Sequence, residues 1–208
     1  MTSEPRERVA DGVGPGATAL MTAGQPGDLP DTGAPTGPIG RAQVLVEGRP
    51  LRFEPHNCFA CGSLNVGGLQ LVLHVEGQAC WTELDLPDRF QGWEGIAHGG
   101  IVCTILDEVM AWALVGQDAW GLTARMTVEF KRPVPVGAHL RAEGRLAEAR
   151  RRLLTTTARL MDASTGEVLA TAEAVYVAAP PDRKRELKRR YGFDEEQPLL
   201  PARPETQP

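Results

Sequence analysis

The residues of this sequence that could do chemistry gather in one apolar stretch, residues 97–115. The stretch opens with a histidine and two glycines and carries two acids in its middle: His98, Gly99, Gly100, Asp107 and Glu108. Almost all its other residues are apolar, which is typical of a buried helix. A carboxylate on such a helix is costly unless it is paired, protonated or facing a wet cavity. We therefore interpret these acids as a clue to function.

The start of the expected helix is suited to hold a developing negative charge. The first turn of a helix has free N–H groups and the positive end of the helix dipole. Glycines at positions 99 and 100 let another molecule approach these donors closely. A carbonyl oxygen that becomes negative in a transition state gains about 3 kcal/mol from one such donor. The pattern thus indicates a site that polarises a carbonyl group.

Asp107 lies too far along the same helix to serve its own helix start. It follows Gly100 at a rise of about 10 Å. It could serve the helix start of a neighbouring copy that lies antiparallel, so we predict a site at a subunit interface. Asp107 and Glu108 point about 100° apart and need not act as a pair. The alternative is that both carboxylates are merely ion-paired at an interface.

Other catalytic chemistries find little support in the sequence. Ser3, Ser63 and Ser164 all lie outside a G-x-S-x-G elbow. H-E-x-x-H, a Walker-type phosphate loop and G-x-G-x-x-G are also absent from the sequence. Cys103 lies among apolar residues with no evident base, so we interpret it as a core cysteine.

Cys58 and Cys61, with His56 nearby, are similar to half of a zinc site. A full structural site needs four ligands, and no second C-x-x-C or H-x-x-x-H follows. Cys80 and Cys103 fall in an expected strand and helix, where small buried cysteines are common. We therefore favour a tight loop over a metal site and expect no metal.

The composition is that of a globular domain with tails. The 208 residues are 42% hydrophobic and 24% charged, and the net charge of −5 argues against nucleic acid as the main partner. No apolar run reaches the roughly 18 residues of a membrane-spanning helix, and residues 1–8 lack the apolar core of a secretory signal. Four cysteines without an export signal favour free thiols. We expect a cytoplasmic protein with no membrane or nucleic-acid partner.

Hydrophobic periodicity predicts a sheet around the helix. Alternation with a period of two predicts strands before and after it, at residues 69–76, 79–86, 122–131, 139–149, 153–162 and 167–178. Residues 87–97 read as a loop that leads to the helix. One long apolar helix needs a surface that covers most of its sides. We therefore predict an α+β fold in which a curved antiparallel β-sheet wraps around one long central helix.

The sequence divides into a domain and two tails. Residues 1–40 are rich in Gly and Pro without an apolar period, which predicts a disordered N-terminal tail. Residues 41–180 form the expected domain. Residues 181–208 combine a short charged helix with a Pro-rich tail. For the basic cluster of that helix we favour a solvated surface over a site for nucleic acid or an acidic cofactor.

The motifs resemble a known family. His98-Gly99-Gly100 followed by Leu106-Asp107 on a long helix resembles the signature of PaaI-like hotdog-fold acyl-CoA thioesterases. Further stretches are similar to segments of the same family: Cys58 to Gly62 with Asn65 and Gly68-Leu69, Gln91 to Trp93, Thr123 to Phe130, and Pro133 to Gly137. The resemblance covers residues 56–178 and leaves the tails outside.

The resemblance implies a hotdog fold, hydrolysis of an acyl-CoA thioester, and specific roles. Asp107 matches the general base on water, or the nucleophile, and Gly100 matches the backbone donor to the thioester oxygen. His98 matches the motif histidine that shapes the turn and contacts substrate. Gln91 stands near the position of an Asn or Gln that orients the carbonyl or the water.

Further residues complete the expected site. We expect contacts to substrate from Gly99, Thr104, Glu108, Lys131 and Arg132, the last two with the phosphates of coenzyme A. No separate cofactor is expected, since coenzyme A is part of the substrate, and the protein should form a homodimer or a dimer of dimers. One alternative is a non-catalytic hotdog dimer that binds acyl-CoA or another apolar ligand. Another is dehydration of a hydroxyacyl thioester, against which the Gly-Gly helix start argues.

Overall fold

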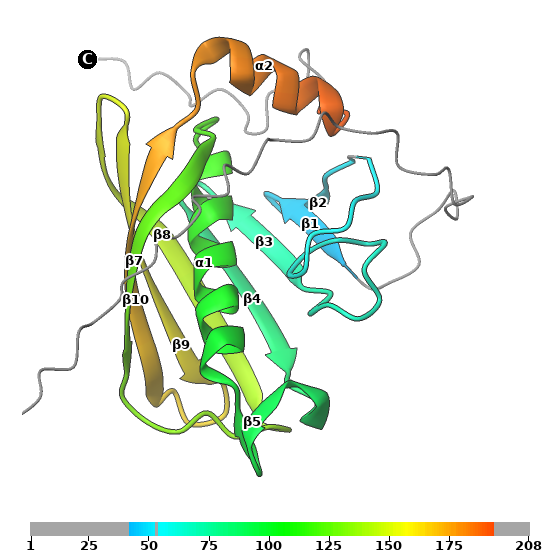
Figure 1. The fold of residues 1–208 in the computed structure, drawn as a ribbon, viewed down its shortest axis with the longest axis vertical. Helices are drawn as coiled ribbons and strands as arrows, with labels where there is room; N and C mark the ends of the chain where they lie inside the picture. Colours follow the sequence, from blue (N-terminus) through cyan, green and yellow to red (C-terminus); the bar gives the residue numbers. More distant parts are fainter. Residues whose placement is uncertain (1–41, 53, 194–208) are drawn as a thin grey trace, which may run out of the picture. The chain divides into compact units, whose positions relative to one another are not determined.

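A computed structural model of the chain describes residues 42–52 and 54–193. The expected tail at residues 1–40 and the Pro-rich end lie outside these residues. Strands come before and after one long helix, and a second, shorter helix ends the described chain (Figure 1). In chain order the elements are β1 (Gln43–Val46), β2 (Arg49–Pro50), β3 (Val72–Glu76), β4 (Ala79–Asp85), a 3₁₀ helix η1 (Asp88–Phe90), β5 (Gln91–Trp93), β6 (Ile96–Ala97), α1 (Gly99–Val115), β7 (Gly121–Phe130), β8 (His139–Arg150), β9 (Leu153–Asp162), β10 (Val168–Ala178) and α2 (Pro181–Arg190).

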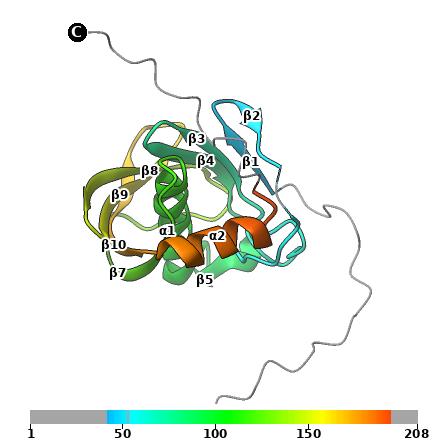
Figure 2. The ribbon, with the colours of Figure 1, turned by 90° about the horizontal axis from the view of Figure 1, so that it is seen from above.

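The main sheet has the strand order β2-β1-β3-β4-β8-β9-β10-β7 and curves around α1, as the view along the helix shows (Figure 2). The predicted architecture of a curved sheet wrapped around one central helix is therefore confirmed. The sheet is mixed rather than purely antiparallel, because β1 pairs with β3 in parallel. The long connection between these two strands gives the chain room to return to the end where β1 starts, which parallel pairing requires.

The helix packs directly on the sheet at β8. Alternate residues of β8 are buried against α1, among them Leu140 and Ala142. A Cβ atom on Gly144 would lie 2.6 Å from the backbone of Val109, a distance that real Cβ atoms do not adopt. Only glycine at this position therefore lets α1 lie so close to the strand.

One stripe of α1 is not fully covered by the sheet. Ile105, Leu106 and Val109 are fully buried, whereas Thr104 and Asp107 are half-exposed. Residues three or four positions apart share one side of a helix. The predicted burial of the helix is confirmed, and Asp107 lies on its more accessible side.

β7 ends the strand order of the sheet, so one of its edges has no strand partner in the described residues. Most of its residues are exposed, including the large apolar side chains of Leu122 and Phe130. A long unpaired edge strand is a ready template for pairing with another chain.

The segment before the helix is more ordered than its sequence indicates. Residues 87–97 were expected to be a loop, but they form η1 and a small antiparallel pair, β5 and β6. These strands have two or three residues each and are mostly exposed. Strands this short and exposed have no alternation of apolar and polar residues by which the sequence could predict them.

The charged helix predicted near the C-terminus is confirmed as α2. Lys184 and Lys188 each lie 2.6 Å from a carboxylate oxygen of Asp118, in the turn after α1. These ion pairs join α2 to the end of α1. Among the described residues, no helix combines the length and hydropathy needed to cross a membrane.

Candidate functional site

Asp107 is held by two hydroxyl groups from the sheet. The Tyr176 hydroxyl donates to Asp107 Oδ1 at 2.7 Å, and the Thr123 hydroxyl donates to the same oxygen at 2.9 Å. The Tyr176 hydroxyl also lies 3.1 Å from the backbone oxygen of Asp107. Within the described part of the chain, Asp107 Oδ2 has no hydrogen-bond partner. One oxygen therefore anchors the carboxylate while the other can accept a proton.

Tyr176 remains a hydrogen-bond donor under all ordinary conditions. Its side chain is buried on β10, and this burial raises its pKa far above the usual value. The hydrogen bond to Asp107 and the charge of that carboxylate raise the pKa further. The phenol therefore keeps its proton and positions the carboxylate of Asp107.

A β-bulge places the two hydroxyls side by side. β7 and β10 pair with Val175 opposite Arg125 and Tyr176 opposite Thr123, so Ala124 has no partner across the ladder. Without the bulge Ala124 would lie opposite Tyr176, and Thr123 would point to the other face of the sheet. Neither hydroxyl was predicted to belong to the site. The signal for Tyr176 was a polar tip in line with alternate positions that otherwise carry alanine, Ala170, Ala172 and Ala174.

His98 caps the start of α1. Its ring atom Nδ1 accepts the N–H of Gly100 at 2.9 Å, and its backbone oxygen accepts the N–H groups of Ile101 and Val102. The N–H of Gly99 has no hydrogen-bond partner in the described residues. The free donor of this turn is thus Gly99, and the Gly100 N–H reaches a substrate only when the His98 ring releases it. The role of Gly100 toward a thioester oxygen stays a prediction.

Gln91 lies close to the helix start but is engaged in its own turn. Its Oε1 accepts the N–H of Gly95 at 3.2 Å, and its backbone pairs with Ala97. A Cβ atom on Gly92 would lie 3.1 Å from the Cα of His98, so β5 packs closely against the capping residue. The structure brings Gln91 near His98, and its role toward a substrate stays a prediction.

The structure separates the predicted catalytic residues into two groups. Gln91, His98 and Gly100 gather at the start of α1, whereas Asp107 lies two turns further along the same unbroken helix. Seven residues of helix span about 10 Å along the axis. The two groups therefore do not meet within one chain.

Glu108 points away from Asp107 into the interior. Its Oε1 accepts the indole N–H of Trp112 at 2.9 Å, and its Oε2 lies 3.9 Å from the thiol of Cys58. Burial, and next the negative charge of Cys58, raise the pKa of Glu108 to about 7. Its predicted contact with substrate is not tested by this arrangement.

The remaining predicted contacts lie within α1 and directly after β7. The Thr104 hydroxyl donates to the backbone oxygen of Gly100 at 2.9 Å. At the end of β7, Lys131 pairs with Glu129, and Arg132 Nε lies 3.1 Å from Glu167 Oε1. These cations are exposed, and weak surface pairs of this kind are readily exchanged for a phosphate.

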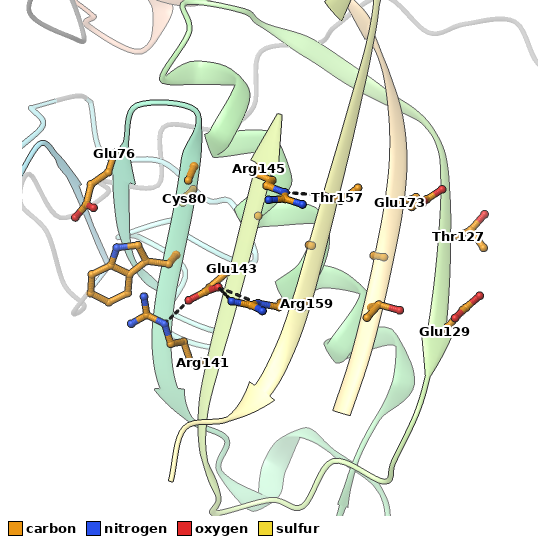
Figure 3. Close-up of a pocket in the computed structure, with 16 residues that line it drawn as sticks. Glu76, Cys80, Thr127, Glu129, Arg141, Glu143, Arg145, Thr157, Arg159 and Glu173 are labelled. Atoms are coloured by element: carbon orange, nitrogen blue, oxygen red, sulfur yellow. Dashed lines mark hydrogen bonds and ion pairs between the residues drawn. The ribbon is translucent and has the colours of Figure 1, made fainter. Parts of the chain in front are cut away.

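A hollow of about 700 Å³ lies on the opposite face of the sheet from α1 (Figure 3). Its floor carries a charged network, in which Glu143 accepts hydrogen bonds from Arg141 at 2.7 Å and from Arg159 at 2.7 Å. None of the predicted site residues lines this hollow. The candidate site is therefore on the helix side.

Comparison with known proteins agrees with the fold. Residues 94–169 match the model of the Thioesterase superfamily. No curated protein matches the sequence. A crystal structure of a thioesterase superfamily protein is 27% identical, with a TM-score of 0.54 over 58% of this chain and 60% of that chain. The chain thus spans less than two thirds of that protein.

Two more distant structures share the fold. The Streptococcus mutans protein smu.793, solved bound to acetyl-CoA, is 15% identical, with a TM-score of 0.50 over 52% of this chain and 88% of that chain. Thioesterase superfamily member 2 from Mus musculus is 17% identical, with a TM-score of 0.50 over 52% of this chain and 82% of that chain. The protein has a hotdog fold, and its residues 94–169 match the thioesterase superfamily.

Proposed function

We propose that this protein is an acyl-CoA thioesterase of the PaaI-like kind, which hydrolyses the thioester to a free acid and coenzyme A. The observation that carries the proposal is the carboxylate of Asp107. It lies on the accessible stripe of a buried helix, anchored through Oδ1 by Tyr176 and Thr123, with Oδ2 unengaged in the described residues. The match of residues 94–169 to the thioesterase superfamily supports the same reaction class.

The geometry suggests how the reaction proceeds. Asp107 Oδ2 takes a proton from a water molecule, whose oxygen attacks the thioester carbonyl. The N–H of Gly99, joined by that of Gly100 when His98 releases it, holds the negative oxygen of the tetrahedral intermediate. The carbon–sulfur bond then breaks, and the proton on Asp107 passes to the leaving thiolate. The products are a carboxylic acid and the thiol of coenzyme A.

The proposed site needs a second copy of the chain. Thr123, which contacts Asp107, lies on the unpaired edge strand β7. Antiparallel pairing of β7 with its copy would set the two α1 helices antiparallel at the new seam. Asp107 of one copy would then approach the Gly99–Gly100 turn of the other. Lys131 and Arg132, at the end of β7, are our candidates for the phosphates of coenzyme A.

The direct test is Asp107→Asn. The amide oxygen can still accept the hydrogen bonds from Tyr176 and Thr123, but the side chain can no longer act as a base. General-base catalysis contributes about 10²–10⁴-fold, so turnover should fall by that factor. The measurement is release of free thiol from a panel of acyl-CoAs of different chain length and aromatic content. Asp182→Asn, at an exposed carboxylate of α2, is the matched control and should hydrolyse at the rate of the parent.

Two results would contradict the proposal. Equal rates for Asp107→Asn and the parent, with circular dichroism showing both folded, would exclude the base. Tight binding of acyl-CoA by the parent without any thiol release would instead favour a non-catalytic binding protein.

A further inference from the structure

The segment that contains the C-x-x-C motif folds back tightly on itself. The Gly62 N–H donates to the Cys58 backbone oxygen at 2.9 Å, and the Leu64 N–H donates to the His56 backbone oxygen at 3.1 Å. A Cβ atom on Gly62 would lie 2.3 Å from the Cys58 nitrogen, so only glycine fits. The turn holds both cysteine side chains within reach of one point.

Three ligand-type side chains meet at this turn, and a fourth, His56, lies beside one of them. The two sulfur atoms of Cys58 and Cys61 and a carboxylate oxygen of Glu108 all lie within 4.8 Å of one another. Cys58 Sγ is 3.9 Å from Glu108 Oε2, and Cys61 Sγ is 3.6 Å from His56 Nε2. Trp112 holds the other oxygen of Glu108, which keeps its carboxylate turned toward the cysteines.

These separations are close to those around a tetrahedral zinc ion. Zinc binds sulfur at about 2.3 Å and nitrogen or oxygen at about 2.0–2.2 Å, which puts a sulfur and a nitrogen or oxygen ligand about 3.6 Å apart. The Cys61–His56 distance equals this value, and the Cys58–Glu108 distance is a few tenths of an ångström longer. His56 lies outside the group of three that share one centre, so its ring must turn toward Cys58 and Glu108 to complete the shell.

The charges of the cluster also favour a cation. As zinc ligands Glu108 and the two cysteines would all be anions, in an interior where Cys61 is only 5% exposed. In the described residues, none of the three forms an ion pair with a lysine or arginine. Ionising all three without a counter-charge is costly, so they do not all lose their protons until a cation binds. A divalent ion would offset that cost, and thiolate ligands with imidazole and carboxylate suit zinc.

We propose that His56, Cys58, Cys61 and Glu108 bind one zinc ion, which joins the 56–62 segment to the middle of α1. The expectation of no metal rested on the absence of a second C-x-x-C or H-x-x-x-H after the first motif. In this proposal His56 and a helix residue, Glu108, take the place of that second pair, and Glu108 is the neighbour of Asp107. The zinc is structural in this proposal, because protein side chains fill all four positions.

The test uses the full chain, purified without chelators from zinc-supplemented cells. Elemental analysis should find about one zinc per chain, the stoichiometry of a single four-ligand site. Removing the zinc with a chelator should lower the Tm, since an ion that binds only the folded state stabilises it. Zinc added back should restore the Tm, whereas magnesium, which prefers oxygen ligands, should not.

Variants separate this site from a non-specific effect. Cys58→Ser and Glu108→Gln should each weaken zinc binding, measured by competition with a chromophoric chelator, by more than the roughly 10–100-fold cost of losing a group that only supports a ligand. Cys103→Ser removes a thiol of the same helix outside the cluster and should bind zinc like the parent.

Three outcomes would overturn the proposal. The first is a parent protein that contains no zinc and takes none from the chelator. The second is a Cys103→Ser variant that loses as much affinity as Cys58→Ser. The third is a Cys58–Cys61 disulfide in fresh protein whose reduced form binds no zinc.

Discussion

Asp107 is a charged residue on a mostly buried helix, and its two oxygens have different surroundings. Oδ1 accepts hydrogen bonds from Tyr176 and Thr123, which offset much of the cost of taking a carboxylate out of water. Oδ2 is the oxygen that can accept a proton from water in the proposed reaction. The neighbouring Glu108 is satisfied in the interior instead, by Trp112 and the Cys58 thiol. Adjacent acids on one helix therefore lie in separate environments.

Tyr176→Phe tests whether the phenol positions the base. It removes the donor without changing the ring, so Asp107 loses its shortest hydrogen bond. We expect kcat to fall by up to about 10²-fold, as misplaced catalytic groups do, with a smaller change in KM. The free energy of unfolding should fall by about 1 kcal/mol for one lost hydrogen bond. Steady-state kinetics and urea unfolding measure the two effects.

Thr123→Val should act in the same direction, since it removes the second donor to Oδ1. Tyr191→Phe changes the other tyrosine of the sequence, at the end of α2, and should leave kcat unchanged. Equal kcat values for Tyr176→Phe and the parent would show that Asp107 is positioned without the phenol.

At the scale of elements, the close contact between α1 and β8 sets the height of the helix above the sheet. Gly144 has no side chain, and the backbone of Val109 and Met110 occupies the space that a Cβ would need. The helix height in turn decides whether Asp107 reaches the hydroxyls on β7 and β10. Gly144 on β8 therefore helps to position Asp107, which accepts hydrogen bonds from residues on two other strands, β7 and β10.

Gly144→Ala should destabilise the fold, because the added methyl group forces the helix away from the strand. Overpacking of this kind costs about 1–3 kcal/mol, which chemical denaturation measures directly. Gly67→Ala is the matched control, since a Cβ there meets only the Asn65 side chain at an ordinary 3.6 Å. Equal stability of the two variants would mean that α1 adjusts to the methyl group without cost.

At the scale of the whole molecule, the residues of the proposed site lie in two separate places within one chain. The start of α1 and Asp107 are separated by two turns of one straight element. The unpaired edge of β7 lies beside Asp107, through Thr123. A copy that pairs there supplies the missing half, so the function we propose belongs to a dimer.

Complementation between two inactive variants tests a shared site. Asp107→Asn lacks the base. Gly100→Pro lacks one helix-start donor, and its ring also disfavours the helical backbone of Gly99, which carries the other donor, although a first helical turn tolerates proline. Each alone should be nearly inactive. Refolded together, they should recover about a quarter of the parent activity, since half of randomly formed dimers are mixed and each mixed dimer has one intact site. No recovery from dimers shown to be mixed would place the whole site within one chain.

The sequence by itself determined the local elements and the main candidate. Period-two alternation predicted the strands, because burial of one face is recorded residue by residue along the chain. An apolar run predicted α1, and a charged stretch predicted α2. The apolar run also singled out Asp107 as a charge on an apolar helix.

Tertiary structure decided which residues contact Asp107 and Glu108. The contacts of Asp107 with Thr123 and Tyr176 span 16 and 69 positions, and that of Glu108 with Cys58 spans 50. Such pairs depend on strand register, on one bulge and on the height of the helix, and hydrophobic periodicity carries no information about these.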